Sequence, residues 1–138
     1  VLIESYISGT EVTCGCYKVK GQEVVFPLTE VVTSNEFFDF DAKYNGQVEE
    51  ITPARIPAEL AERIQRETLR IYDILGAKGI IRVDYIIEAN GEAKLLDINT
   101  TPGMTATSFI PQQVRAAGLD IKDVMSDIIG NELNKICQ

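Results

Sequence analysis

The sequence predicts an α+β fold in which a mostly antiparallel sheet has helices packed on one side. Three observations favour this fold class. Strand-like segments dominate the first part of the chain, helix-like segments dominate the end, and an Asn-Gly dipeptide at residues 90–91 separates two alternating apolar runs. The composition agrees with a single domain, because 138 residues, of which 45% are hydrophobic and 25% are charged, can bury a core.

The first part of the chain carries strand signals. Residues 1–7 are rich in β-forming types, residues 8–10 predict a turn, and residues 11–19 alternate as a second strand. A turn over residues 20–22 then precedes a strand over residues 23–33. Residues 34–47 follow neither the helical nor the strand period, so we expect a long surface loop there. Loops of that length are usually functional or disordered.

Helical signals come later in the chain. Pro57 begins a predicted helix that runs to residue 75, with apolar residues on one stripe and a glycine at its end. Ser108 caps a short predicted helix that continues through residues 112–117. Asp120 caps a final helix that extends to about residue 136.

The Asn-Gly dipeptide predicts a tight hairpin between strands at residues 80–88 and 92–99, because a type I′ turn needs positive φ at both central residues. In a two-residue loop Asp84 faces Asp97, Arg82 faces Asn99, and the pleat puts all four on one face. Two carboxylates about 5 Å apart repel by about 3 kcal/mol at an effective dielectric constant of 20. This patch therefore needs a cation or a shared proton.

Three interpretations of this patch stay open from the residues alone. Two carboxylates and an amide oxygen form a hard-oxygen set that suits Mg²⁺ or Mn²⁺ beside phosphate, and Arg82 would add a cation for a transferred phosphate or a developing oxyanion. Alternatively, Arg82 bridges Asp84 and Asp97 as a structural ion pair. The third is a glycosidase-like carboxylate pair, which Arg82 and Asn99 fit less well.

The residue types exclude several functions. The chain has three cysteines and no histidine, which removes histidine-based triads and zinc sites with histidine ligands. Cys14 and Cys16 lie on the same face of a predicted strand, so we expect buried thiols and not a redox pair. An odd cysteine count without a disulfide framework is typical of a reducing cytoplasm.

Charge and hydropathy narrow the range of partners. A net charge of −8 and a pI near 4.5 argue against a nucleic-acid surface. No apolar stretch approaches the roughly 20 residues that span a bilayer, and P-loop and Rossmann motifs are absent. Because the chain starts at Val1 without a secretory signal, we expect it to begin in the middle of a longer protein.

Two motifs resemble a known family. Gly-Ile-Ile-Arg-Val-Asp at residues 79–84 and Leu-Leu-Asp-Ile-Asn-Thr-Thr-Pro-Gly-Met-Thr at residues 95–105, followed by Ser108, are similar to segments of the D-alanine:D-alanine ligases, which are ATP-grasp enzymes. The resemblance covers nearly the whole chain and includes residues 4–11 and the Ala-Lys-Tyr triplet at residues 42–44. The arginine-aspartate strand is shared by ATP-grasp enzymes generally, whereas the Asn-Thr-x-Pro-Gly-Met-Thr run and the triplet are more specific. The fold that this resemblance implies is an ATP-grasp C-terminal domain.

The resemblance also implies an activity. ATP converts one D-alanine into an acyl phosphate, and the amine of a second D-alanine displaces phosphate to form the dipeptide that peptidoglycan synthesis uses in the bacterial cytoplasm. Asp84 and Asp97 would bind one Mg²⁺ or Mn²⁺ ion, and Asp97 with Asn99 would bind a second. The implied partners are the small molecules D-alanine and ATP, with no nucleic acid and no membrane, and a homodimer of the full-length enzyme is allowed.

Roles for further residues follow from the same resemblance. Arg82 and the backbone amide of Gly103 would stabilise the oxyanion of the tetrahedral intermediate, and Ser108 with the Phe109 amide would receive the carboxylate of the second D-alanine. Tyr44 would help the loop over residues 34–47 to close. The implied nucleotide contacts are an adenine hinge at Glu4, Ser5, Tyr6 and Ile7, a ribose contact at Glu11, a phosphate contact at Lys43 and a surface for the base at Ile86. From the residues alone, Ile86 and Leu95 fit a core as well as a floor for a base, and Lys43 fits a solvated surface.

Two departures from the family pattern limit the prediction. The family more often has glutamate where this chain has Asp97, so the bridging carboxylate is one methylene shorter. The first D-alanine site and the other ATP-binding lysines belong to earlier domains, so we expect this chain to be the C-terminal portion of a longer ligase and to be inactive alone. The alternatives are another ATP-grasp carboxylate-amine ligase and a non-catalytic nucleotide-binding module. Tyr44 argues against variants that form a hydroxy-acid ester.

Overall fold

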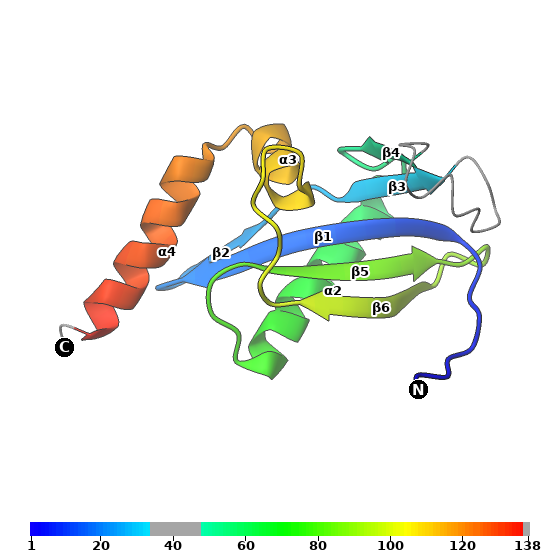
Figure 1. Ribbon diagram of the computed structural model, residues 1–138, viewed down its shortest axis with the longest axis horizontal. Coiled ribbons are helices and arrows are strands. Elements are labelled where there is room, and N and C mark those ends of the chain that lie inside the picture. The colour runs from blue at the N-terminus through cyan, green and yellow to red at the C-terminus, as the bar shows by residue number, and fades with distance from the viewer. Residues whose placement is uncertain (34–47, 137–138) are drawn as a thin grey trace.

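A six-stranded antiparallel sheet forms the centre of the computed structural model, which describes residues 1–33 and 48–136 (Figure 1). The strand order is β4-β3-β1-β5-β6, and β2 also pairs with β1. The strands are β1 (Thr10–Val19), β2 (Gln22–Val25), β3 (Thr29–Thr33), β4 (Val48–Ile51), β5 (Ile81–Ile87) and β6 (Ala93–Asn99). The predicted α+β class and the antiparallel sheet are therefore confirmed.

The ten-residue strand β1 organises the sheet. One edge of β1 pairs with β5, and the other edge pairs first with β3 and then with β2. The single strand expected over residues 23–33 is thus two strands, separated by residues 26–28. Pro27 lies at this interruption, and a proline has no N–H to donate to a ladder of hydrogen bonds.

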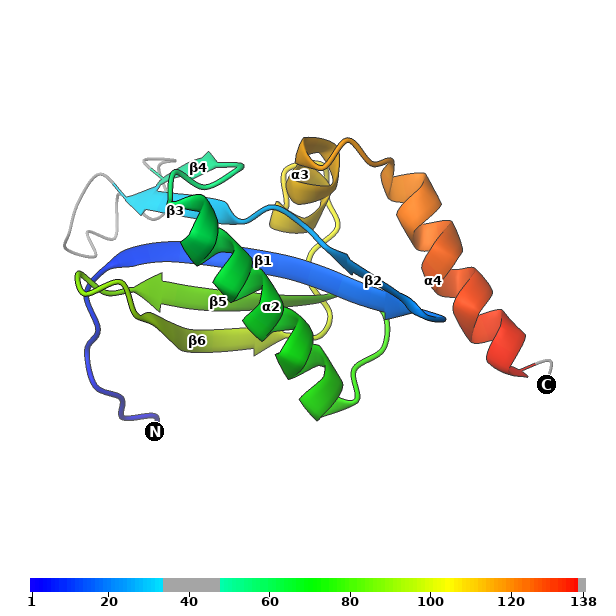
Figure 2. The ribbon, with the colours of Figure 1, turned by 180° about the vertical axis from the view of Figure 1, so that it is seen from behind.

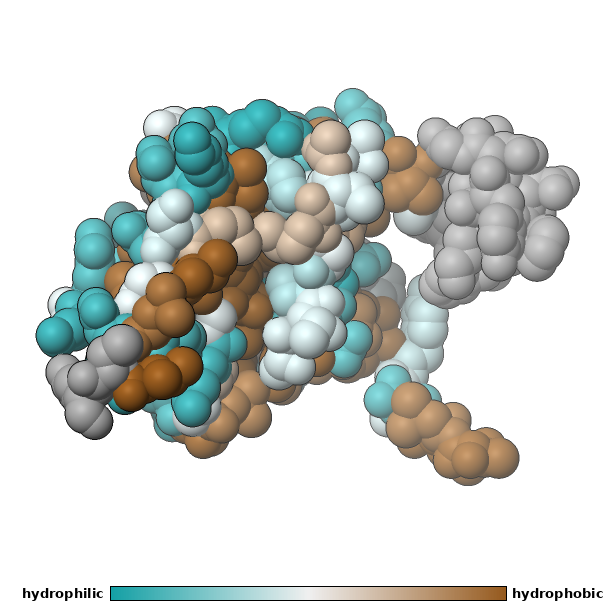
Figure 3. Space-filling view, turned by 60° about the vertical axis from the view of Figure 1, so that its left-hand side comes forward, coloured by the Kyte–Doolittle hydropathy of each residue, from teal (hydrophilic) through white to brown (hydrophobic). Residues whose placement is uncertain are grey.

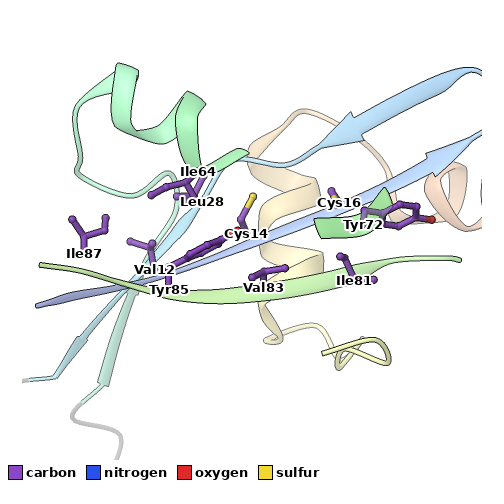
Figure 4. Packing of buried hydrophobic residues seen from close by; sticks show 10 residues of the cluster. All are labelled: Val12, Cys14, Cys16, Leu28, Ile64, Tyr72, Ile81, Val83, Tyr85 and Ile87. Carbon is purple, nitrogen blue, oxygen red and sulfur yellow. The ribbon is translucent and has the colours of Figure 1, made fainter. Parts of the chain in front are cut away.

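Helix α2 (Ala58–Leu75) covers one face of the sheet (Figure 2). It begins after Pro57 and ends at Gly76, whose φ of 60° is left-handed, as the sequence predicts. Its buried side chains pack on the apolar face of β1 and β5, and the resulting core is drawn in Figure 4. This core contains Val12, Cys14, Cys16, Leu28, Ile64, Tyr72, Ile81, Val83, Tyr85 and Ile87.

Helices α3 (Phe109–Ala116) and α4 (Ile121–Ile136) lie on the other side of the sheet, as the opposite views in Figures 1 and 2 show. The expectation that all helices pack on one side is therefore wrong. The physical reason is visible in β1, where six consecutive residues from Val12 to Tyr17 are buried, so both faces need cover. The second core contains Tyr17, Phe26, Ile80, Ile110, Val114 and Val124.

Residues 1–8 form no strand, although their composition is β-rich. The first six side chains are exposed, and Figure 1 shows this segment leading away from the sheet. Strand-forming residues need a partner strand, and in the described part of the chain this segment pairs with none. The strand predicted over residues 1–7 is therefore wrong.

Large apolar side chains are exposed at several places on the surface. Figure 3 shows those on the first residues of the chain and along α4. On α4 they are Ile129, Leu133 and Ile136, which are 57%, 54% and 78% exposed. Among the described helices, none combines the length and the hydropathy that crossing a membrane requires.

Candidate active site

The hairpin of β5 and β6 places the predicted polar residues on one face. Arg82 pairs with Asn99, and Asp84 pairs with Asp97, in the register that the sequence predicts. The turn itself differs from the prediction, because it has three residues and not two. The Glu88 N–H donates to the Glu92 carbonyl at 2.8 Å, and the Gly91 N–H donates to the Glu88 carbonyl at 2.9 Å.

This turn is not type I′. Gly91 has a φ of 84°, but none of the described non-glycine residues has a positive φ, and this includes Asn90. A turn that ends in one left-handed glycine is the usual form of a three-residue hairpin loop. The register at the far end still agrees with the prediction because the pairing shifts by one residue between Asp84 and Tyr85.

The shift changes which residues share a face near the turn. Tyr85 pairs with Leu95, and Ile86 pairs with Lys94. The two-residue loop predicted from the sequence would pair Leu95 with Ile86 on the face of Asp84. This pairing is wrong, and Lys94 takes that place. Leu95 is 52% exposed, so it is not a core residue either.

Arg82 is held from two directions. Its Nε and Nη2 donate to the two carboxylate oxygens of Asp84 at 3.1 and 3.3 Å, and these side chains are only 18% and 14% exposed. The Phe109 ring from α3 lies 5.0 Å from the guanidinium carbon. A two-bond carboxylate contact and a cation–π contact together fix the plane of the guanidinium group.

The patch around Arg82 has an excess of negative charge. Burial raises the pKa of Asp84, and Asp97 adds to the rise, although the hydrogen-bonded Arg82 opposes it. Glu11 lies on the next strand and pairs with Ile86. Burial raises the pKa of Glu11, and the nearby Asp84 raises it further. Glu11 and Asp84 thus lie near one arginine, and Asp97 adds a third carboxylate next to Asp84. Such a patch favours an added cation.

The donor atoms fit Mg²⁺ or Mn²⁺. Among the residues that the structure describes, no group of three or more carboxylates, thiols or imidazoles gathers as a complete metal site. Two carboxylates and one amide are a sparse set, which Mg²⁺ completes with water and phosphate oxygens. The Asp97 and Asn99 Oδ1 atoms accept the N–H groups of Ile98 and Thr101 at 2.9 and 3.0 Å. Each oxygen keeps a second lone pair, so these bonds leave room for a metal.

The N-terminus of α3 lies beside this patch. Ser108 precedes the helix in an extended conformation, and its Oγ binds Thr105 and not an amide of the helix. A side chain at Gly103 would come within 3.0 Å of this Oγ, so the Gly103 backbone lies directly against Ser108. The first N–H groups of a helix have no partner within it, and they attract carboxylates.

The structure therefore brings most of the predicted site residues together on one face and one helix end. These residues are Glu11, Arg82, Asp84, Ile86, Asp97, Asn99, Gly103, Ser108 and Phe109. Glu4, Ser5 and Tyr6 are exposed in the segment before β1, and Ile7 is half-buried. Lys43 and Tyr44 lie outside the described residues, as does the loop predicted over residues 34–47.

Sequence reasoning missed two contributions from α3. It assigned a role to the Phe109 amide but not to the ring that covers Arg82, and it did not single out Gln113, which is fully buried. A glutamine between the apolar residues of a short helix is a weak signal, since glutamine is a common residue in helices. A buried polar side chain becomes informative only when its partners are known.

Comparison with known proteins identifies the family. The model of the family described as D-ala D-ala ligase C-terminus matches residues 1–130. The chain belongs to this family. Membership in the D-ala D-ala ligase C-terminus family confirms the resemblance that the two motifs predict, and with it the ATP-grasp type of fold.

The relatives of this chain include a D-alanine–D-alanine ligase of Parabacteroides distasonis, which is 82% identical to it over 133 residues. The match covers 96% of this chain and 40% of that protein. Among solved structures, the VanG D-Ala:D-Ser ligase of Enterococcus faecalis has a TM-score of 0.78 at 34% identity, over 91% of this chain and 36% of that one. A D-alanine–D-alanine ligase of Bacillus anthracis complexed with ATP has a TM-score of 0.74 at 30% identity, over 95% and 40%. The chain thus spans about two fifths of the length of such relatives.

Proposed function

We propose that the full-length protein containing this chain ligates two D-alanines to D-alanyl-D-alanine, with ATP and an acyl phosphate intermediate, for peptidoglycan synthesis in the bacterial cytoplasm. The observation that carries the proposal is Arg82, which is bound by Asp84, covered by Phe109, and next to Asp97, Asn99 and the N-terminus of α3. The 82% identity to a D-alanine–D-alanine ligase supports the choice of substrate.

Asp84, Asp97 and Asn99 would hold two Mg²⁺ or Mn²⁺ ions. When bound, these ions would neutralise the phosphates of ATP and favour transfer of the terminal phosphoryl group. The pKa of Asp84, which is raised mainly by burial and further by the charge of Asp97, supports this role, because a bound cation relieves the repulsion between the carboxylates. The similarity to a ligase solved in complex with ATP supports ATP as the phosphoryl donor.

Arg82 would stabilise the oxyanion that develops when the second amine attacks the acyl phosphate. Its guanidinium group is already oriented by Asp84 and Phe109, so little reorganisation is needed during the reaction. The Gly103 N–H would donate to the same oxygen. Gly103 lies against Ser108, so the Gly103 N–H and the Ser108 hydroxyl both lie in the segment just before α3.

The N-terminus of α3 would bind the carboxylate of the second D-alanine. The Ser108 hydroxyl and the Phe109 N–H are the groups that would donate to it. The Ser108 hydroxyl is hydrogen-bonded to Thr105 at 2.7 Å, a contact that orients it without using a helix amide. A helix N-terminus adds a favourable electrostatic term for an anion.

The adenine hinge would be formed by Glu4, Ser5, Tyr6 and Ile7. In the described residues this segment pairs with no strand, so its peptide groups are open to a base. Glu11 would take the ribose, and the half-buried Ile86 would pack on the base. The remaining nucleotide contact, Lys43, and the loop residue Tyr44 complete the proposal.

The test uses the full-length protein with ATP and Mg²⁺. We expect phosphate release with D-alanine, and mass spectrometry should identify D-alanyl-D-alanine as the product. D-Lactate and L-alanine serve as controls for the second substrate, and neither should support comparable phosphate release. Phosphate release without dipeptide formation would refute the proposal.

A second candidate activity is the ligation of D-alanine to D-serine. The likeness to the VanG D-Ala:D-Ser ligase favours it, because that structure matches this chain with a TM-score of 0.78. The ratio of kcat/KM for D-alanine and D-serine as second substrates, measured on the full-length protein, decides between the two activities. If neither yields a product, the non-catalytic nucleotide-binding module becomes the better interpretation.

A further inference from the structure

Gln113 joins α3 to the sheet through hydrogen bonds of both its side-chain oxygen and its side-chain nitrogen. The Gly15 N–H donates to Gln113 Oε1 at 2.9 Å. Gln113 Nε2 lies 3.2 Å from the Thr13 carbonyl, 3.2 Å from Thr13 Oγ1 and 3.0 Å from Thr29 Oγ1. Gln113, Thr13 and Thr29 are at most 1% exposed, so these bonds do not compete with water.

These hydrogen bonds fill a gap in the ladder along β1. On this edge β3 pairs with β1 as far as Thr13, and β2 pairs with it from Cys16. Between the two strands, the Phe26 N–H donates to the Gly15 carbonyl at 3.0 Å. The Gln113 amide supplies an acceptor for Gly15 and a donor for Thr13, as a strand peptide would.

The backbone of β1 lies in direct contact with α3. A Cβ atom at Gly15 would lie 2.3 Å from Ile110 Cδ1 and 3.1 Å from Gln113 Oε1. Among the described residues, no buried side-chain nitrogen or oxygen lacks a hydrogen-bond partner. A shift of α3 along β1 would therefore take from these buried polar groups the partners that they have here.

Gln113 is linked to the candidate active site by two short paths. Along α3 it lies four residues after Phe109, which is about 6 Å of rigid helix. Across the sheet, Gly15 pairs directly with Arg82. The Phe109 ring covers the Arg82 guanidinium, so the two paths meet at the same pair of residues.

We propose that Gln113 is a positioning residue that sets the place of the α3 N-terminus relative to Arg82, and thereby the affinity for the carboxylate of the second substrate. The identity of that substrate rests on the proposed function, whereas the positioning of α3 does not. Gln113 itself touches neither substrate nor reacting atoms in this proposal.

The test replaces Gln113 with methionine, which has a similar length and no hydrogen-bonding amide, in the full-length protein. We expect the KM for the second D-alanine to rise at least about fivefold, while the KM for ATP changes little. The matched control is Gln65→Leu. Gln65 also donates through Nε2 to a backbone carbonyl, that of Phe26, but it lies on α2 on the opposite face.

A milder variant covers the case in which Gln113→Met does not fold. Thr29→Val removes one acceptor of the Gln113 amide and lies on β3, two strands away from Arg82. Thr29→Val should also raise the KM for the second D-alanine, but by a smaller factor than Gln113→Met does. The proposal is overturned if the folded variants keep the wild-type KM, or if Gln65→Leu raises it equally.

A second readout separates this inference from the proposed function. Amide hydrogen exchange in α3 should be faster in Gln113→Met than in wild type, and unchanged in Gln65→Leu. If the wild-type protein makes no dipeptide, the proposed function fails, but this exchange measurement still decides whether Gln113 positions α3. Equal exchange in all three proteins would refute the positioning role.

Discussion

At the scale of single residues, Asp84 and Asp97 differ in their surroundings although they face each other. Asp84 is mostly buried and binds Arg82 through both oxygens, whereas Asp97 is exposed and accepts only the N–H of its neighbour Ile98 through Oδ1. Asp84 therefore orients the arginine, and Asp97 has more freedom to bind a ligand. The short side chain of Asp97 is compatible with ligand binding at this exposed position.

Asp84→Ala should lower kcat of the full-length protein at least about a hundredfold, because it removes a predicted metal ligand and frees Arg82. The measurement is D-alanyl-D-alanine formation at saturating ATP and D-alanine. Asp73→Ala is the matched control, since Asp73 pairs with Lys18 on the exposed surface of α2 and should have little effect. Activity retained in Asp84→Ala would refute the metal assignment.

Glu11→Gln should stabilise this chain at neutral pH. A carboxyl whose pKa is raised by folding holds its proton more tightly in the folded state. The loss of folding free energy caused by ionised Glu11 is absent below the ordinary pKa of the carboxyl and reaches its full size above the raised pKa. We therefore expect the variant to exceed wild type by less than about 1 kcal/mol at about pH 8, and by nothing at about pH 3.5.

Urea unfolding of the two proteins at both pH values measures this difference. The comparison between pH values isolates the titration of Glu11 together with its effect on the neighbouring Asp84, because distant groups titrate equally in wild type and variant. A variant that is less stable than wild type at high pH would show that Glu11 makes a favourable contact as a carboxylate.

At the scale of elements, the hairpin shows how much of the site was predictable. The period of two in residues 80–88 and 92–99 was enough to pair Asp84 with Asp97 and Arg82 with Asn99. The turn has one residue more than predicted, and the irregularity between Asp84 and Tyr85 compensates for it. Local propensity cannot reveal this compensation, because it depends on packing along the whole strand.

The placement of the helices was less predictable than their existence. The predicted ends of α2 agree with the structure because Pro57 and Gly76 act locally. The face on which α3 packs depends on Gly15, which allows contact with Ile110, and on Gln113, whose partners are almost a hundred residues away in sequence. Neither residue carries a signal that one sequence can show, so the two-sided arrangement was missed.

Gly15→Ala should destabilise this chain by about 1–3 kcal/mol, because the added methyl would overlap Ile110 and press on Phe26 in a fully buried region. Gly130→Ala is the control. Gly130 lies within α4, has no positive φ, and its added methyl would meet nothing within 4 Å. That variant should stabilise the chain by about 0.5–1 kcal/mol, since alanine favours helix.

Thermal unfolding followed by circular dichroism distinguishes the two glycine variants. The expected opposite signs exclude a general effect of added methyl groups. A neutral result for Gly15→Ala would mean that α3 can move away from β1 without cost, which conflicts with the hydrogen bonds of Gln113.

At the scale of the whole molecule, the chain holds the proposed metal ligands and the proposed carboxylate site for the second D-alanine, but it spans only about two fifths of the length of its relatives. We expect no D-alanyl-D-alanine formation by this chain alone, even at saturating substrates. The control is the full-length protein in the same assay. Dipeptide formation by the chain alone would show that the first D-alanine site also lies within it.

The apolar side chains on α4 predict how the isolated chain behaves in solution. Ile129, Leu133 and Ile136 follow one another at helical spacing and are each more than half exposed. Such a patch is typical of a surface that contacts protein. We expect the isolated chain to self-associate through it, and sedimentation velocity at increasing concentration should show the average mass rising.

The double variant Ile129→Lys and Leu133→Lys should abolish this association. Added positive charge also reduces the net charge of −8, which by itself would favour association, so the control must add the same charge elsewhere on α4. Ser126→Lys with Asn134→Lys provides it, because both residues are exposed and polar. If this control also sediments as a monomer, or if wild type is monomeric at every concentration, the apolar face of α4 is not the surface through which the chain associates.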